Sequence, residues 1–349
     1  MAHSGDYYRN LISGETRGFW PSIQRRALHL TSVPYGWGMG LRNRLYERGW
    51  KRSQRVPVAV VSVGNLTLGG TGKTPCVEYV ARFYRGQDLR VAILSRGYGS
   101  SAGRNDEALV LEQNLPDVPH LQGADRVGLA MTAVEELESE ILILDDGFQH
   151  RRLHRDLDLV LTDATNPWGH GYLFPRGLLR EPPRSIRRAD MVLLTRCDQV
   201  DEKTRQRIQE RIANYAPDLP VALTTHKPIE LRNSEENTAP LETLKARPVA
   251  AFCGIGNPQA FRQTLAGLDA EISAFRIFPD HHAYTRADVE ELRRWAGQQA
   301  NDCLIVTTEK DLVKLLLPQL GGRPLWALRI CLHLETGEET LHRKLLSVV

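Results

Sequence analysis

The chain has 349 residues, 42% of them hydrophobic and 25% charged, which is the composition of an ordinary globular protein. Its length favours two domains, and its net charge of +3 gives no reason to expect a nucleic-acid partner. The five cysteines form no C-x-x-C pair and no metal-binding spacing, and no apolar run approaches the ~20 residues that span a bilayer.

Residues 17–55 interleave basic and aromatic side chains. They include nine Lys or Arg residues against one acidic residue, Glu47, together with Trp20, Trp37 and Trp50. Aromatic and basic residues around a short apolar centre are typical of a helix that lies in a membrane interface. An ordinary helix docked on the core with a solvated basic face is the alternative. We predict that residues 1–55 form a membrane-associated segment, although residues 1–16 alone are polar and uninformative.

A phosphate-binding loop is predicted after a short apolar run. Val58 to Val63 is rich in β-branched residues and indicates a buried strand, which a Gly-rich turn follows. Glycines let backbone N–H groups turn toward an anion, and a helix N-terminus adds its dipole. A turn without a ligand is the alternative, and Thr67 stands where the strict pattern has Gly. We predict nucleotide binding by Gly69, Gly70, Thr71, Gly72, Lys73 and Thr74.

Within this loop, Lys73 is expected to reach the β- and γ-phosphates, and the hydroxyl of Thr74 to ligate Mg²⁺. The matching carboxylates come from a later strand, because the aliphatic residues 141–144 are followed by D-D-G-F-Q-H at 145–150. An apolar strand that ends in Asp downstream of a P-loop is typical of a magnesium site, and adjacent carboxylates favour a nearby cation. We therefore predict Asp145 and Asp146 at the metal.

Other strands of this half are expected at 89–94, 157–161 and 191–194. The first precedes the polar turn S-R-G-Y-G at 95–99, and such turns commonly carry ligand loops. Residues 174–182 form a Pro-containing loop whose arginines suit a phosphate, with a solvated surface loop as the alternative. The last strand ends in T-R-C-D at 195–198, similar to the guanine-reading motif of small GTPases. A membrane-associated P-loop GTPase or ATPase switch is therefore the alternative function.

The composition changes after residue 226. Residues 227–247 are polar and contain proline, as expected of a linker or ribbon. A second α/β pattern follows, with strands near 249–253, 274–278, 303–307 and 325–328 and a helix over 286–299. It contains D-H-H at 280–282 directly after a strand, where clustering favours a functional site over packed histidines. We predict a P-loop domain over 56–226 and a smaller α/β domain over 248–349.

Several motifs occur in the order of a known family. They are G-N-L-T-L-G-G-T-G-K-T-P, S-R-G-Y-G, D-D-G-F-Q-H, L-R-E-P, D-H-H and T-T-E-K-D. Their combination, between about residue 35 and about residue 312, resembles the tetraacyldisaccharide 4′-kinase (lipid A 4′-kinase) family, in which Thr67 also fits. One departure is that the family's V-G-D-E-P appears as R-N-D-E-A around Asp106.

The resemblance implies an α/β fold with a P-loop core, a second, smaller α/β domain and an N-terminal membrane-associated helix. It implies transfer of the γ-phosphate of ATP, with Mg²⁺, to the 4′-hydroxyl of an acylated glucosamine disaccharide 1-phosphate, which forms lipid IVA. The expected location is the cytoplasmic face of the inner membrane of a Gram-negative bacterium, against its inner-leaflet lipids.

The resemblance also implies residue roles. Asp106 would be the base on the sugar hydroxyl, assisted by His281. Lys73, which holds the phosphate, and Asp146, at the metal, would be the other catalytic residues. A carboxylate suits the first role because a sugar hydroxyl is a poor nucleophile until its proton is accepted. The positions that match the family's substrate-lining residues are Arg126, Gln149, His150, Arg180 and Glu181.

Overall fold

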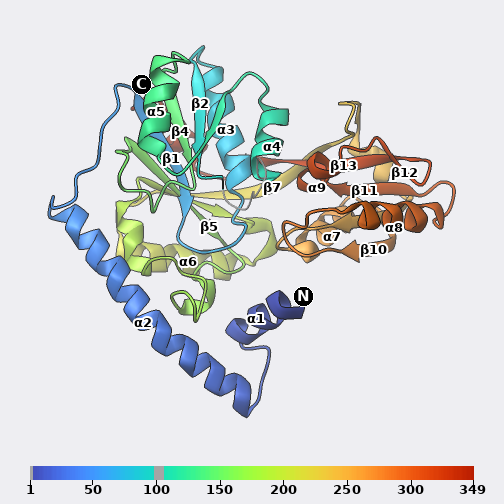
Figure 1. The fold of residues 1–349 in the computed structure, drawn as a ribbon, viewed down its shortest axis with the longest axis horizontal. Coiled ribbons are helices and arrows are strands. Elements are labelled where there is room, and N and C mark those ends of the chain that lie inside the picture. Colours follow the sequence, from blue (N-terminus) through green and yellow to red (C-terminus); the bar gives the residue numbers. More distant parts are fainter. Residues whose placement is uncertain (1–2, 98–105) are drawn as a thin grey trace. The chain divides into compact units, whose positions relative to one another are not determined.

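A parallel sheet forms the centre of the first of two units (Figure 1). The computed structural model describes residues 3–97 and 106–349, with side chains from Tyr7 onward. Unit 1 contains residues 1–97, 118–225 and 332–349. Most of its strands are aliphatic and buried, as expected for a parallel sheet covered on both faces. Their order is β3 (His120–Gln122), β2 (Val91–Ser95), β4 (Ile141–Asp145), β1 (Ala59–Asn65), β5 (Leu157–Asp163), β6 (Met191–Thr195) and the start of β7 (Val221–Arg232).

The helices of unit 1 include the N-terminal pair and the C-terminal helix of the chain. They are α1 (His3–Ser13), α2 (Phe19–Glu47), α3 (Lys73–Arg85), α5 (Arg126–Glu135), α6 (Glu202–Tyr215) and α10 (Glu338–Leu346). Helix α10 is bound to α3, because the Tyr84 hydroxyl donates to the Leu345 carbonyl at 2.9 Å. The ring of His342 also stacks on Tyr79, with its Nε2 2.8 Å from the Tyr79 hydroxyl.

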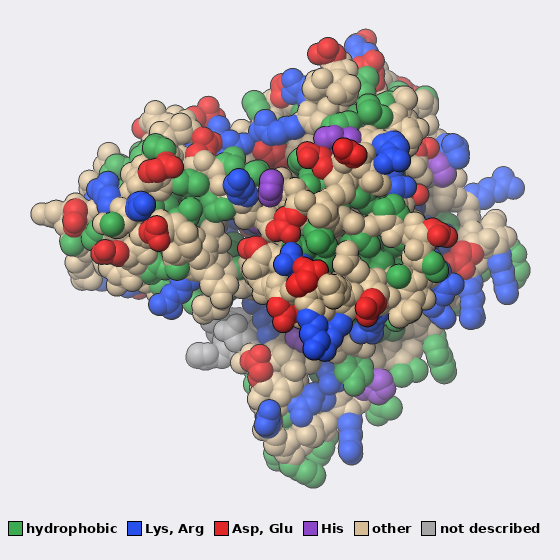
Figure 2. Space-filling model, turned by 180° about the vertical axis from the view of Figure 1, so that it is seen from behind, with side chains coloured by type: hydrophobic (Ala, Val, Ile, Leu, Met, Phe, Trp, Pro, Cys, Tyr) green, Lys and Arg blue, Asp and Glu red, His purple; other side chains and the backbone are tan. Residues whose placement is uncertain are grey.

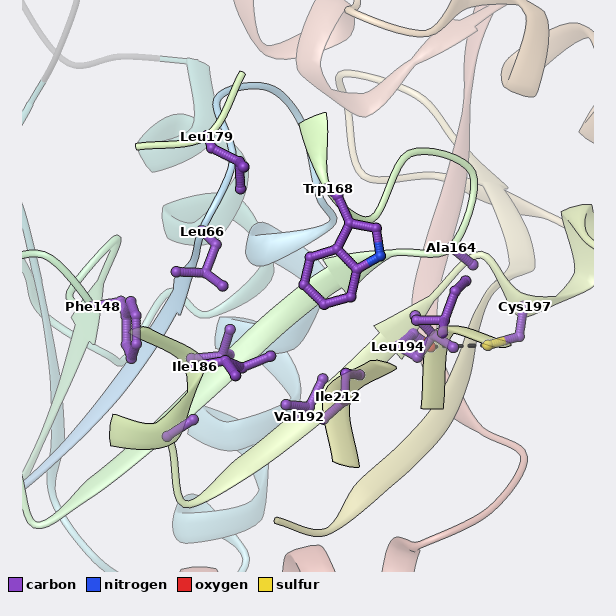
Figure 3. Close-up of a cluster of buried hydrophobic side chains, with 13 residues drawn as sticks. Leu66, Phe148, Ala164, Trp168, Leu179, Ile186, Val192, Leu194, Cys197 and Ile212 are labelled. Carbon is purple, nitrogen blue, oxygen red and sulfur yellow. Dashed lines mark hydrogen bonds between the residues drawn. The ribbon is translucent and has the colours of Figure 1, made fainter. Parts of the chain in front are cut away.

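One apolar cluster in unit 1 supports the loops around the strand ends (Figure 3). Leu66 and Phe148, which follow β1 and β4, contribute to it together with Trp168. Ile212 of α6 is fully buried in the same cluster. This packing fixes the loops that follow the carboxyl ends of the strands, where ligand-binding residues of α/β proteins are found.

Unit 2 contains residues 98–117 and 226–331 and has its own parallel sheet. The strand order is β10 (Glu271–Ile277), β9 (Pro248–Cys253), β11 (Leu304–Thr308) and β13 (Arg323–Leu334). Short β8 (Thr238–Ala239) and β12 (Gln319–Leu320) pair antiparallel with β7 and β13. Phe252 is fully buried beneath the rings of Phe278 and Trp295. The helices are α4 (Asp106–Asn114), α7 (Pro258–Gly267), α8 (Arg286–Gly297) and α9 (Glu309–Leu315).

The predicted α/β class is confirmed, and one local expectation is corrected. Residues 1–16 are not uninformative, because α1 forms there and buries Leu11 and Ile12. The start of the expected linker or ribbon, through residue 232, continues strand β7. Helix α4 clusters with unit 2 and α10 with unit 1, so the units are not consecutive stretches of chain. The boundaries 56–226, 227–247 and 248–349 stay a prediction.

Candidate active site

The Gly-rich loop of unit 1 joins β1 to α3 and leaves room for a ligand. Gly72 adopts a left-handed conformation with φ of 87° and precedes the first helical residue, Lys73. The N-terminus of α3 has no side-chain cap and no acidic residue in its first turn, so the N–H groups and the dipole of this helix favour an anion. Gly69 has φ of 109°, and an added Cβ there or at Gly70 would meet no atom within 4 Å. The loop therefore has both the donors and the space that a triphosphate needs.

Buried polar side chains hold this loop from below. Asn65 donates from Nδ2 to the Thr67 carbonyl at 2.8 Å and to the Thr71 hydroxyl at 3.0 Å. The hydroxyl of Thr195, at the end of β6, donates to the Thr71 carbonyl at 3.0 Å. The next residue, Arg196, donates to the Gly70 carbonyl at 2.7 Å and pairs with Asp163. The T-R-C-D motif thus braces the loop.

Asp146 is the centre of a charged cluster beside the loop. Arg180 contacts both of its carboxylate oxygens, at 2.7 and 2.8 Å, and Lys73 Nζ lies 3.6 Å away. Asp146 has φ of 55°, a conformation that is costly outside glycine and that recurs at functional sites. The structure therefore brings together three residues that the sequence placed in one site, with the lysine at the helix N-terminus.

The charges of this cluster control its titration. Burial alone would raise the pKa of Asp146, but Lys73 and Arg180 outweigh it and hold the pKa below its ordinary value. Arg126, buried at the start of α5, adds to this effect. Burial, followed by Arg126 and Arg155, lowers the pKa of His150 to about 4. At neutral pH Asp146 is therefore a carboxylate, and His150 is a neutral imidazole.

The residues expected at the metal are placed next to the loop. Strand register pairs Asp145, the last residue of β4, with Val63 of β1. Asp145 is buried. The pKa of the Cys76 thiol in α3 is raised mainly by the burial of that thiol and also by the negative charge of Asp145. Thr74 is also buried, in the first turn of α3. Hydroxyl and carboxylate oxygens are the ligands Mg²⁺ prefers, usually with phosphate and water, so the donors present fit that ion.

Two of the predicted substrate residues have structural partners. Gln149 donates from Nε2 to the Asn65 carbonyl at 2.9 Å, and its Oε1 accepts from Arg180 at 3.2 Å. Glu181 is fully buried, and its Oε2 accepts from Asn43 Nδ2 at 2.7 Å and lies 2.9 Å from Arg188. Glu181 is therefore held beneath the loop surface, and its predicted contact with substrate stays a prediction.

A second cluster lies in unit 2 and is centred on Asp106, the first residue of α4. Its carboxylate oxygens are 2.8 and 2.9 Å from Nδ1 of His281, although 175 residues separate the two. The side chain of Asp106 is 5% exposed and that of His281 is 56% exposed. His281 has φ of 55°, and its Nε2 lies 3.9 Å from Asp280. The imidazole of His281 therefore lies between the buried Asp106 carboxylate and the solvent.

Electrostatics keep Asp106 ionised. Burial would raise its pKa, but the hydrogen bond and charge of His281, with Lys310 and Lys314, lower it. The hydrogen bond to Asp106 in turn raises the pKa of His281 against the opposing effect of burial. Lys314 Nζ is 3.7 Å from Asp106, and Lys310 pairs with Glu107 at 2.7 Å. The lowered pKa keeps Asp106 in its carboxylate form at neutral pH, which is the form that can accept a proton from an alcohol.

The other residues of the second cluster distinguish the two adjacent histidines. His282 lies 3.1 Å from Asp288 and stacks on the ring of Phe278. Asp311 is fully buried and accepts from the Tyr284 hydroxyl at 3.0 Å and from the Gly254 amide at 3.0 Å. His281, the first histidine of the motif, contacts Asp106, whereas His282 contacts Asp288 and Phe278.

Sequence reasoning missed several of these residues. Lys310 is the lysine of the T-T-E-K-D motif and Lys314 lies four residues after it, a helical spacing that could have placed both on one face of α9. Asn43 carried no local signal, because its partner Glu181 lies 138 residues away in the chain. Tyr98, Gly99, Arg104 and Asn105, part of the predicted loops around S-R-G-Y-G and R-N-D-E, lie outside the described residues.

Comparison with known proteins gives consistent matches along the chain. A family profile described as tetraacyldisaccharide-1-P 4′-kinase (LpxK) matches residues 24–349. A tetraacyldisaccharide 4′-kinase of Syntrophus aciditrophicus is 41% identical over 313 residues, covering 82% of this chain and 83% of the relative. One of Anaeromyxobacter dehalogenans is 40% identical over 339 residues, covering 91% and 89%. A crystal structure of LpxK from Aquifex aeolicus in complex with ATP is similar at a TM-score of 0.74 and 32% identity, covering 93% of this chain and 99% of that one.

Proposed function

Because the chain belongs to the tetraacyldisaccharide-1-P 4′-kinase family, we propose that its two charged clusters divide one phosphoryl transfer between them. The protein is a kinase that transfers the γ-phosphate of ATP to the 4′-hydroxyl of a tetraacyldisaccharide 1-phosphate and so forms lipid IVA in lipid A biosynthesis. Its cofactors are ATP and Mg²⁺. The alternative of a GTPase switch is not favoured by this family membership.

We assign the phosphate side of the reaction to the cluster of unit 1. The amides of Gly69 to Thr74 bind the phosphates, and Lys73 places a cation where negative charge develops during transfer. Thr74 and Asp145 would hold Mg²⁺, which when bound neutralises phosphate charge. Arg180 fixes the carboxylate of Asp146 so that its charge stays directed at Lys73, as the distances of 2.7 and 3.6 Å support.

We assign the acceptor side to the cluster of unit 2. The observation that supports this is the buried, ionised Asp106 with His281 at 2.8 Å. During turnover Asp106 accepts the proton of the 4′-hydroxyl as the hydroxyl oxygen attacks the γ-phosphorus of ATP. The O–H bond and the bond from the γ-phosphorus to the bridging oxygen break, a new O–P bond forms, and ADP leaves. His281 orients the carboxylate and stabilises its charge. Arg126, Gln149 and His150 remain the candidates for contact with the disaccharide.

Helix α2 is proposed as the contact with the membrane that holds the acylated substrate. Phe19, Trp20, Leu30, Trp37 and Leu41 are between 60% and 76% exposed. Figure 2 shows Lys, Arg and hydrophobic side chains interleaved toward the lower right of the view, where α2 lies. Aromatic rings between basic residues favour the interface of an anionic bilayer, to which each cation adds about 1 kcal/mol. In the described part of the chain, no helix has the length and apolar character needed to traverse a bilayer.

We place the protein at the cytoplasmic face of the inner membrane, because ATP is cytoplasmic and the acylated substrate stays in the bilayer. The function is tested with purified protein, ATP, Mg²⁺ and detergent-dispersed disaccharide 1-phosphate. A bisphosphorylated disaccharide, identified by its mass, is the expected product, and a Lys73→Ala protein prepared in parallel is the control. Hydrolysis of ATP without phosphorylated lipid would contradict the proposal.

A further inference from the structure

One face of helix α2 is bound to the loops that carry the first charged cluster. The Asn43 amide donates to the buried Glu181 carboxylate at 2.7 Å, and the Tyr35 hydroxyl donates to the carbonyl of Arg180 at 2.9 Å. Arg42 donates to the carbonyl of Gln149. These contacts reach Arg180 and Gln149. Arg180 in turn donates to both Gln149 and Asp146.

The same face of α2 packs closely against the loop that precedes Arg180. A Cβ at Gly36 would come within 2.7 Å of Leu173, so α2 and the loop before Arg180 lie in close contact. The ring of Tyr35 meets Phe174 edge to face at 5.9 Å. Glu181 is fully buried and charged, so its position is costly to change unless Asn43 and Arg188 move with it.

The apolar side chains of α2 lie on the other face. Ser32 and Asn43 are buried, with Tyr35 and Met39 partly buried at helical spacing between them. Leu30, Trp37 and Leu41 are exposed at the complementary spacing. Helix α2 therefore has solvent-exposed apolar side chains on one face, and on the opposite face it forms hydrogen bonds to the loops of the candidate active site.

From this arrangement we propose that Asn43 is a positioning residue for phosphoryl transfer. Asn43 holds Glu181, and Glu181 in turn fixes the backbone of its neighbour Arg180. The guanidinium of Arg180 then holds Asp146 beside Lys73. Helix α2 is thus part of the catalytic framework as well as a membrane contact, and the two roles belong to opposite faces. This inference rests on the proposed function and goes beyond it, because it gives a membrane-contacting helix a direct effect on ATP use.

The test measures ATP kinetics and vesicle binding on the full-length chain. Asn43→Ala leaves the buried Glu181 with one partner fewer, and we expect kcat/KM for ATP to fall by roughly tenfold, with a higher KM, in detergent-dispersed substrate. A preparation in which a smaller fraction of the molecules is folded would show a lower apparent kcat but the same KM for ATP. Asn43→Gln, which retains an amide donor, should recover part of the loss. Sedimentation with phosphatidylethanolamine–phosphatidylglycerol vesicles should stay at the wild-type level.

Reciprocal variants separate the two faces. Trp37→Ser should reduce vesicle sedimentation and keep the wild-type KM for ATP, and Thr31→Ala, at an exposed position of α2, serves as the matched control. An Asn43→Ala protein with wild-type KM and kcat would overturn the inference. If that variant does not fold, Tyr35→Phe decides, because it removes one hydroxyl bond to Arg180 and keeps the ring; an unchanged KM would then reject the inference. A wild-type protein that binds ATP but phosphorylates no lipid would instead reject the proposed function.

Discussion

The pair of Asp106 and His281 should give the protein a pH-dependent part of its stability. Replacing His281 by Ala removes the hydrogen bond at 2.8 Å and the charge that helps to keep Asp106 ionised. A charge-assisted hydrogen bond contributes ~1.5–3 kcal/mol, but the imidazole is 56% exposed, so solvent screening reduces the expected loss to about 1 kcal/mol. For a domain of this size that corresponds to a decrease in Tm of about 2–4 °C.

The sign of the pH dependence follows from the two pKa shifts. The pKa of His281 is raised by its bond to Asp106, so its contribution is complete below the unfolded value of about 6.5 and is lost as the pH rises through the folded value. The pKa of Asp106 is lowered overall, burial notwithstanding, so its contribution is present above about 3.9 and is lost in stronger acid. The pair therefore stabilises most between these two values.

The assay compares thermal unfolding of wild type and His281→Ala at about pH 5.5 and about pH 9, on either side of the ordinary histidine pKa. We expect the Tm difference to be larger at the lower pH. His333→Ala is the matched control, because that histidine is exposed and forms no ion pair in the described part of the chain. Equal Tm differences at both pH values, or a difference no larger than that of the control, would refute the reasoning.

Three further substitutions test the site and the membrane contact. Lys73→Ala should lower kcat by about 10²–10³ because charge on the transferred phosphoryl group is no longer stabilised; a near-normal kcat in a coupled ADP assay would count against the P-loop assignment. Asp106→Ala should lower kcat by about 10²–10⁴ while ATP binding, measured by calorimetry, is retained; weakened ATP binding with normal kcat would exclude a role as base. Trp20→Ser combined with Trp37→Ser should reduce vesicle partitioning by at least about tenfold, since each indole buries a large apolar surface; unchanged sedimentation would refute the membrane face of α2.

Local patterns predicted the parts of the fold that depend on local forces. The aliphatic runs before Asn65 and Asp145 become β1 and β4, because such runs are stable only when buried on both faces. The glycines and Lys73 form the expected loop and helix start because glycine readily adopts positive φ, which is a local property of the residue. The family resemblance placed Asp106 and His281 in one site, and their contact follows that expectation.

Long-range electrostatics could not be read from the chain. Lys314 approaches Asp106 although 208 positions separate them, and no periodicity encodes such a contact. Glu181 occurs in a polar-looking loop, yet it is fully buried because Asn43 and Arg188 satisfy its carboxylate. The polar residues 227–232 left open whether the chain forms a ribbon or a linker there; they continue β7, whose Leu231 and Arg232 pair with β8. In each case the decisive partner is distant in sequence.

The packing of α10 against α3 has a consequence for biosynthesis. Tyr84 and Tyr79 of α3 are translated 261 and 263 residues before their hydrogen-bond partners in α10, Leu345 and His342. Until then the nascent chain exposes an aromatic surface on the nucleotide-binding half, and exposed apolar surface of this kind is what chaperones bind. Truncated messages that end before codon 338 should therefore yield products that are cleared by proteases rather than partly active enzyme.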